Sequence, residues 1–342
     1  MLIRRGLISA LVSILVFAAI MLVMACVIAG CRSSDSSKGG KALEVATTVA
    51  PITSIVSAIG GDRVTVTGII PEGTNSHTFE PRPSVAETLS SANVLYVSGM
   101  GLEDPTVKMA KEVMPQGSDV LALSDHALPK SKWIFDSSFP RSAGKPNPHL
   151  WTDPQLALAY AREVRDDLSK RDPGGSKQYQ LNYLRFAAAT ERLDKAMRRS
   201  FATIPEAKRK LLTYHDGYAY FARDYGWKVI GAIQASDFED PTASEVSALI
   251  DQIRAEQVPA IFGSEVFPSP VLAEISHETG VRYVDQLRDD DLPGQPGQPD
   301  HSLFGLLRYD YTVMTEAMGG NASALKQASL TSPTRDQATY PQ

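Results

Sequence analysis

The sequence is poor in cysteine: among 342 residues only Cys26 and Cys31 occur, both at the end of the first apolar segment. If residues 1–30 are removed as an export signal, only Cys31 remains, so no disulfide holds the fold and no thiolate deeper in the chain can bind a metal. Enzyme fingerprints are also lacking, because there is no nucleophile elbow, no P-loop and no dinucleotide-binding motif. These absences direct attention to the six histidines and to the carboxylates.

The chain has no excess of positive charge either. Its formal net charge is −5, and removing residues 1–30 takes away two arginines and no acidic residue, which lowers the charge to −7. An acidic chain disfavours nucleic acid as a partner and mildly favours a cationic ligand. The 312 residues that remain exceed what one ordinary core holds, which suggests two domains.

The N-terminal segment has the pattern of an export signal. Arg4 and Arg5 precede an almost uncharged apolar run that ends in VMACVIAGC. The last four residues of this run resemble the lipobox of bacterial lipoproteins, in which a peptidase cuts before a cysteine that becomes diacylated. We therefore predict a signal peptide over residues 1–30, a lipid on Cys31 and a solvated tether over residues 31–42. The mature protein would be anchored to the cell membrane outside the cytoplasm, on the periplasmic side or the outer surface; a retained signal anchor is the alternative.

Two blocks of the mature chain, 43–174 and 205–325, each alternate apolar strands with helical patterns. Such alternation is typical of parallel α/β sheets with helices on their faces. The predicted strands are 43–49, 64–70, 93–98 and 119–123 in the first block, and 210–213, 227–233, 260–263 and 281–284 in the second. The predicted helices include 84–91, 105–113, 217–225, 242–256, 270–278 and 302–318.

One segment between the blocks reads as a single long helix. Residues 175–204 contain no proline and place apolar residues near helical spacing, which predicts about thirty helical residues, or roughly 45 Å at 1.5 Å per residue. The predicted fold is therefore α/β: two lobes, each with a central mainly parallel sheet and flanking helices, joined by one long rigid helix. The alternative is a surface helix packed on one domain. Residues 125–148 and 289–301 are predicted loops, and 326–342 a tail.

Three histidines and one aspartate lie where such folds bind ligands. His77 and His215 each follow a predicted strand by a short loop, Asp285 ends the last predicted strand, and His149 stands just before a predicted helix. Open parallel sheets bind ligands outside the carboxyl ends of their strands. Any one of these histidines alone could be a structural residue. Their joint placement, with two residues from each block, predicts a metal site.

Other polar residues are weaker candidates. Glu265 also follows a predicted strand, and we expect it to orient an imidazole N–H rather than to bind metal directly. His126, His277 and His301 are expected to be solvated. The acidic run Asp289 to Asp291 is expected to form a solvated face.

With these residues assembled, the chain resembles the zinc/manganese solute-binding lipoproteins of bacterial ABC transporters. The likeness covers nearly all of the chain and is carried by HTFEPRPS, GMGLED, NPHLWTDP, TYHDGYAYFARDYGW and EISHETGVRYVDQL. It implies two lobes of one topology joined by a rigid helix, with metal between them held by His77, His149, His215 and Asp285. Manganese-type members tend to have a glutamate at the third position, where this chain has histidine. The histidine-rich loop of many zinc-type members is missing here, because His126 is the only histidine in that region.

Three imidazoles and one carboxylate form a nitrogen-rich site, which suits Zn²⁺, whereas Mn²⁺ prefers more oxygen ligands. We therefore expect a carrier without enzymatic activity that binds Zn²⁺, or else Mn²⁺, as its transported ligand. We also expect a monomer, and the resemblance implies that it delivers the metal to an ABC-transporter permease. Two other functions stay open: a hydrolase that binds zinc through the three histidines and keeps a position for water, and a surface adhesin anchored at Cys31.

Overall fold

The structure, a computed structural model, describes residues 42–234, 241–264 and 269–341. The predicted signal peptide, the lipidation site Cys31 and the candidate Glu265 lie outside the described residues. Residues from Ala42 to the C-terminus form one compact unit, and the predicted domain boundaries within it stay predictions. Among the described residues, no helix combines the length and the apolar character that a membrane span requires.

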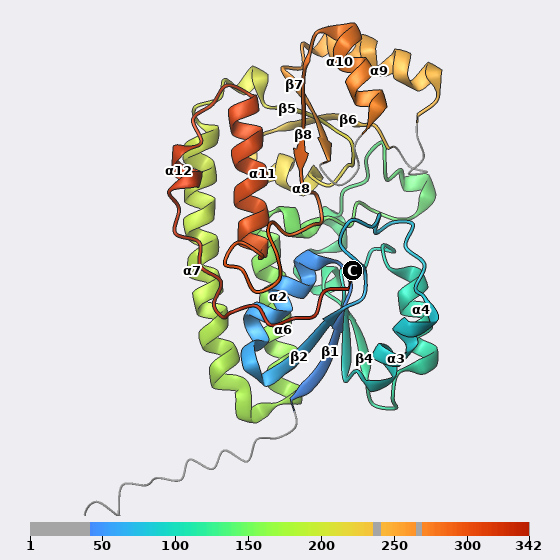
Figure 1. The fold of residues 1–342 in the computed structure, drawn as a ribbon, viewed down its shortest axis with the longest axis vertical. Coiled ribbons are helices and arrows are strands. Elements are labelled where there is room, and N and C mark those ends of the chain that lie inside the picture. Colours follow the sequence, from blue (N-terminus) through green and yellow to red (C-terminus); the bar gives the residue numbers. More distant parts are fainter. Residues whose placement is uncertain (1–41, 235–240, 265–268, 342) are drawn as a thin grey trace, which may run out of the picture. The chain divides into compact units, whose positions relative to one another are not determined.

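The first half of this unit is built around a parallel sheet. Its elements are β1 (Leu43–Thr47), α2 (Ala50–Gly60), η1 (Gly61–Arg63), β2 (Val64–Gly68), α3 (Pro83–Ser91), β3 (Val94–Val97), α4 (Asp104–Val113), β4 (Asp119–Ala122), α5 (Ser124–Ala127), η2 (Lys130–Lys132), η3 (Arg141–Ala143), η4 (Leu150–Thr152), α6 (Pro154–Arg171) and η5 (Pro173–Gly175). The four strands pair in the order β2-β1-β3-β4 (Figure 1). Every residue of β3 is buried, as expected of a central strand whose sheet is covered on both faces.

The second half repeats this arrangement. After η6 (Glu206–Lys208), its elements are β5 (Lys210–Thr213), α8 (Ala219–Tyr225), β6 (Lys228–Ala232), α9 (Ala243–Glu256), β7 (Ala260–Ser264), α10 (Pro270–Thr279), β8 (Arg282–Leu287), α11 (Leu303–Ala317) and α12 (Ser323–Lys326). The strands pair in parallel in the order β6-β5-β7-β8, which matches the strand order of the first sheet. The predicted α/β class with two parallel sheets is confirmed.

The long helix between the sheets is α7 (Ser176–Phe201). It packs against α2 and α6 of the first half and against α11 and α12 of the second, as Figure 1 shows. This excludes the alternative of a helix that packs on one half alone. The largest buried apolar cluster is continuous across both halves; it includes Val45 and Tyr96 from the first sheet, Phe186 from α7, and Leu211 and Phe262 from the second sheet.

The chain after α12 returns to the first sheet. Residues 328–341, which we call the strap, run past α2 and meet β2 at Thr339 (Figure 1). The amide of Thr339 donates to the carbonyl of Val66, and the amide of Gly68 donates to the carbonyl of Thr339, both at 2.9 Å. Because β2 lies at the edge of its sheet, the strap covers backbone groups that an edge strand otherwise leaves open.

His301, which was expected to be solvated, is instead 1 % exposed. Its Nδ1 lies 3.4 Å from Asp336 of the strap, and its Nε2 lies 3.5 Å from Glu72. Burial by itself lowers the pKa of His301, but the interactions with Asp336 and Glu72 outweigh burial and raise the pKa to about 9. Two carboxylates from distant parts of the chain therefore keep this imidazole charged at neutral pH.

This arrangement predicts how stability depends on pH. Since the folded-state pKa of His301 is raised above the unfolded value of ~6.5, its stabilisation is fully present below about pH 6.5 and is lost as the pH rises through about 9. We expect the difference in free energy of unfolding between wild type and His301→Gln to shrink by about 3 kcal/mol between pH 6.5 and 9.5. Urea unfolding across this range measures it, and a difference that stays constant with pH would contradict it.

Candidate metal centre

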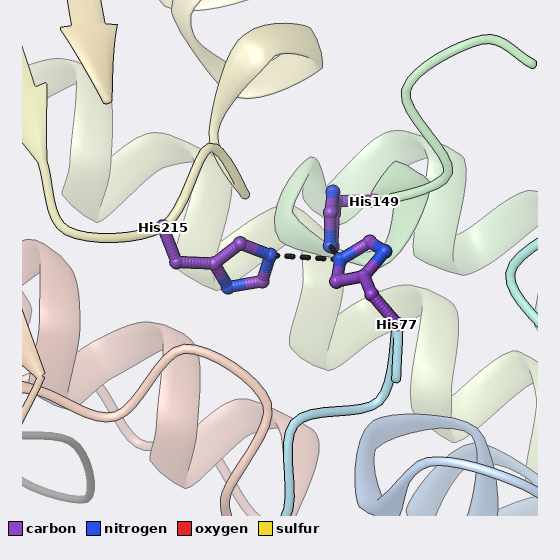
Figure 2. A group of neighbouring side chains, drawn as sticks. All are labelled: His77, His149 and His215. Atoms are coloured by element: carbon purple, nitrogen blue, oxygen red, sulfur yellow. Dashed lines mark hydrogen bonds between the residues drawn. The ribbon is translucent and has the colours of Figure 1, made fainter. Parts of the chain in front are cut away.

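The three predicted histidines converge. The Nε2 atom of His77 lies 3.1 Å from Nε2 of His149 and 3.0 Å from Nε2 of His215, and Figure 2 shows the three rings turned toward one another. Each residue offers one nitrogen within 4.8 Å of the others, in a group that could hold a metal ion. A hydrogen bond between two imidazole nitrogens forms only if one of them carries a proton. Three converging nitrogens therefore cannot all hydrogen-bond well to one another, whereas all three can bind one shared cation.

The local sequence NPHLWTDP fixes His149. Its Nδ1 lies 2.8 Å from Oδ1 of Asn147, and since an amide oxygen can only accept, Nδ1 carries the proton and Nε2 keeps its lone pair. Directly after His149 the chain forms η4, and Asp153 then caps α6 by accepting from the amides of Gln155 and Leu156. The side chain of Asn147 also donates to the carbonyl of Asp216 at 2.9 Å. This bond joins the His149 segment to the loop that carries His215.

His77 and His215 come from loops that follow strands. His215 lies two residues after β5, and Oγ1 of Thr213 donates to its carbonyl at 2.6 Å. The loop from β2 to α3 carries His77, whose amide donates to Oδ1 of Asn75 at 3.0 Å. The ring of Phe139 lies against this group, with its centroid 5.6 Å from the ring of His77 and 5.9 Å from that of His149. The predicted placement at the carboxyl ends of strands therefore holds for His77 and His215.

Burial keeps these imidazoles neutral. It is the main reason that the pKa values of His77 and His149 lie well below 6.5, and repulsion from the neighbouring imidazoles lowers both further. Burial also lowers the pKa of His215, while the negative charge of Asp289 acts in the opposite direction. Neutral imidazole is the form that binds metal, so the histidines are ready to bind without first losing protons at neutral pH.

The structure does not bring the predicted carboxylate, Asp285, to the histidines. β8 extends to Leu287, three residues beyond the predicted strand end, so Asp285 lies within the strand, where its side chain is exposed. It is also absent from the group of converging ligand atoms found among the described residues. The expectation for Asp285 is therefore corrected: β8 ends later in the chain than predicted, and the position that follows the strand end is later as well.

Asp289 occupies that later position. It is 8 % exposed and lines a small cavity of about 20 Å³ together with His215. Burial raises the pKa of Asp289 to about 6, and attraction to His215 partly offsets the effect. Its Oδ2 is buried and has no hydrogen-bond partner among the described residues. Its backbone has φ of +54°, a conformation that costs energy in a residue with a side chain.

The neighbouring acidic residues, expected to form a solvated face, instead hold two loops together. Ser76 donates from its hydroxyl to Asp290 at 2.9 Å, and the amide of Gly73 donates to both carboxylate oxygens of Asp291 at 2.9 and 3.1 Å. The acidic run therefore binds the loop that precedes His77. The sequence analysis missed this role because a run of like charges usually faces water. The position of the run just after a strand was the signal that could have indicated the role.

His77 also lines a cavity of about 130 Å³. Met100, Phe139 and Lys145 are among the residues that line it. A second group of possible ligands, Glu274, His277 and Glu278 on α10, is exposed. His277 is therefore solvated, as expected.

A comparison with protein families identifies the family of this chain. The family model described as "Zinc-uptake complex component A periplasmic" matches residues 45–317. The chain belongs to this family. The match includes all three histidines and Asp289 and ends at the last residue of α11, so the strap lies beyond the matched region.

Similar members of the family carry the names of different metals. The manganese-binding lipoprotein MntA of Halalkalibacterium halodurans is 28% identical over 306 residues, covering 88% of this chain and 98% of its own. The iron-binding protein YfeA of Yersinia pestis is 28% identical over 291 residues, covering 85% and 90%. The periplasmic zinc-binding protein TroA from Treponema pallidum has the same fold, with a TM-score of 0.73 at 23% identity, covering 82% and 99%. The family is thus one of metal-binding substrate-binding proteins of ABC transporters.

Proposed function

We propose that this protein captures a divalent metal ion, Zn²⁺ in preference to Mn²⁺, with His77, His149, His215 and Asp289, and delivers it to an ABC-transporter permease. The observation that carries the proposal is the convergence of three histidines: the Nε2 atoms of His149 and His215 lie 3.1 and 3.0 Å from Nε2 of His77, and all three ligand atoms lie within 4.8 Å of one another. Membership in a family of substrate-binding proteins supports delivery to a permease. In this proposal Cys31 anchors the protein on the outer face of the cell membrane, as several relatives named lipoproteins suggest.

Asp289 is proposed as the fourth ligand in place of Asp285. Its buried Oδ2 without a hydrogen-bond partner and its electrostatic interaction with His215 support this choice. A buried carboxylate oxygen that lacks a donor is costly, and a cation beside it would remove that cost. Its left-handed backbone conformation is a further sign of a constrained functional position.

The choice of zinc follows from the chemistry of the donors. Three imidazole nitrogens and one carboxylate oxygen suit tetrahedral Zn²⁺ with Zn–N distances of ~2.0–2.1 Å. Mn²⁺ is harder and binds better where oxygen ligands predominate. The names of similar proteins include manganese, iron and zinc, so they do not decide the metal. The preference for zinc is argued from the three histidines and Asp289 alone.

The same fourth ligand argues against a hydrolase. A catalytic zinc with three histidines needs a coordination position for water. In our proposal Asp289 fills that position, so bound zinc would have no water to activate. The surface adhesin stays a prediction.

The proposed function is tested by metal titration. The metal-free protein is titrated with Zn²⁺ and Mn²⁺ in competition with a chelator, and the zinc-loaded protein is assayed with ester and phosphate substrates. We expect one zinc ion per chain, binding tighter than Mn²⁺ by more than about tenfold, and no turnover. Binding of neither metal would remove the carrier proposal, and zinc-dependent turnover would favour the hydrolase.

A further inference from the structure

The strap, residues 328–341, is anchored in the first half of the molecule by side chains as well as by its backbone pairing with β2. Its residue Thr334 donates from Oγ1 to the carbonyl of Ser57 on α2 at 3.1 Å. The hydroxyl of Ser57 in turn donates to Oδ1 of Asp336 at 2.7 Å. The strap therefore follows the end of α2 closely over several residues.

Asp336 is the centre of these contacts. Besides Ser57, it accepts from the hydroxyl of Tyr340 at 2.6 Å and from the amide of Ala338 at 3.0 Å, and it lies 3.4 Å from Nδ1 of His301. The ring of Tyr340 lies edge-on to the ring of His301, with centroids 4.5 Å apart. Removing the Asp336 carboxylate would leave several donors without their acceptor at one place.

The contacts continue from His301 to both loops of the metal centre. Glu72, which lies 3.5 Å from His301, also accepts from the amide of Leu292 at 3.0 Å. Glu72 begins the loop that leads to His77, while Leu292 ends the acidic segment that contains Asp289. A single carboxylate therefore joins the two loops and is itself held by His301.

An apolar contact adds to this connection. Leu292 is 1 % exposed and belongs to a small buried cluster with Tyr340 of the strap, Ala50 of α2 and Leu306 of α11. Tyr340 thus touches His301 with its ring and packs in the cluster that fixes Leu292. The strap is therefore connected to the acidic segment in two ways: through the charged contacts of Asp336, His301 and Glu72, and through the apolar contact of Tyr340 with Leu292.

We propose that the strap positions the loops that carry His77 and Asp289, with Asp336 as the positioning residue, and thereby slows the release of zinc. This inference rests on the proposed function. The family match ends before the strap, so the proposal concerns a segment that the family model does not cover. Outer partners that orient metal ligands change metal affinity by about 10–100-fold when mutated, which sets the scale of the expected effect.

The test compares Asp336→Asn with the matched control Asp300→Asn. Asp300 is exposed, precedes His301 in the chain, and pairs through its carboxylate with Arg308 rather than with His301. Zinc-loaded protein is mixed with excess chelator and the rate of zinc release is followed, while the thermal stability of each metal-free variant is measured separately. We expect zinc release from Asp336→Asn to be about tenfold faster than from wild type, and release from Asp300→Asn to be unchanged.

Tyr340→Phe provides a milder variant if Asp336→Asn folds poorly. It removes the hydrogen bond to Asp336 and keeps the ring in its cluster, so zinc release should accelerate in the same direction by a smaller factor. If both variants lose thermal stability while zinc release stays at the wild-type rate, the strap only stabilises the fold and the inference is wrong. If wild type itself binds no zinc at the histidines, the proposed function fails first, and the strap inference fails with it.

Discussion

Replacing Asp289 by asparagine is expected to weaken zinc binding by more than about 100-fold, because it removes the one carboxylate proposed as a direct ligand. The matched variant is Asp285→Asn, in the same segment of chain. Asp285 is exposed on β8, so its replacement should leave the zinc affinity within about twofold of wild type. Chelator competition on both proteins measures the two affinities side by side.

The pair of variants separates a ligand from a structural residue. Asparagine has nearly the same shape as aspartate, and burial already raises the pKa of Asp289 to about 6, which means that the charged form is disfavoured there without metal. The metal-free Asp289→Asn protein should therefore be at least as stable as wild type at neutral pH. If zinc affinity falls in Asp285→Asn and not in Asp289→Asn, the ligand assignment is reversed.

The difference between these two aspartates also shows what sequence reasoning could not provide. Their relation to β8 decides which one faces the histidines, and a prediction of strand ends commonly errs by a few residues. The positions of His77 and His215 were easier to predict. A histidine in a loop after a strand stays near the same edge of the sheet even when the predicted strand end is wrong by a few residues. The convergence of His149 with them depends on contacts such as Asn147 with Asp216, which link distant segments.

Adding zinc to the metal-free protein is expected to raise its free energy of unfolding by about 4 kcal/mol when free zinc is 1,000 times the dissociation constant. For a chain of this size the increase corresponds to a rise in melting temperature of about 6 °C. The physical reason is that only the folded protein brings the three Nε2 atoms together, so the metal binds the native state alone. In His149→Ala this rise should be lost, since a fully buried ligand is removed from the centre.

His277→Ala is the control for that measurement. His277 is exposed on α10 and, with Glu274 and Glu278, forms the other group of possible ligands found among the described residues. Its replacement should leave the zinc-induced rise intact. If the zinc-induced rise persists in His149→Ala and disappears in His277→Ala, the main zinc-binding site is on the surface of α10 and not at the three histidines.

The fold itself was largely accessible from the sequence, and the two wrong expectations about solvent exposure have one cause. Parallel strands buried on both faces give apolar runs that stand out locally, and the long helix is marked by its length without proline. The environments of His301 and of Asp289 to Asp291 were predicted wrongly because they are buried by segments far away in the chain, the strap and the loop before His77. Composition near a residue carries no information about such partners.

The shared core has a consequence for how the chain acquires its structure. Phe186 of α7 packs against Phe304 of α11, with ring centroids 4.6 Å apart, and Tyr340 near the C-terminus packs in one cluster with Ala50. Contacts of such long sequence separation form slowly, because the intervening chain must first be brought back on itself. The N-terminal half therefore cannot complete its interior until residues as distant in the chain as Phe304 and Tyr340 have packed against it.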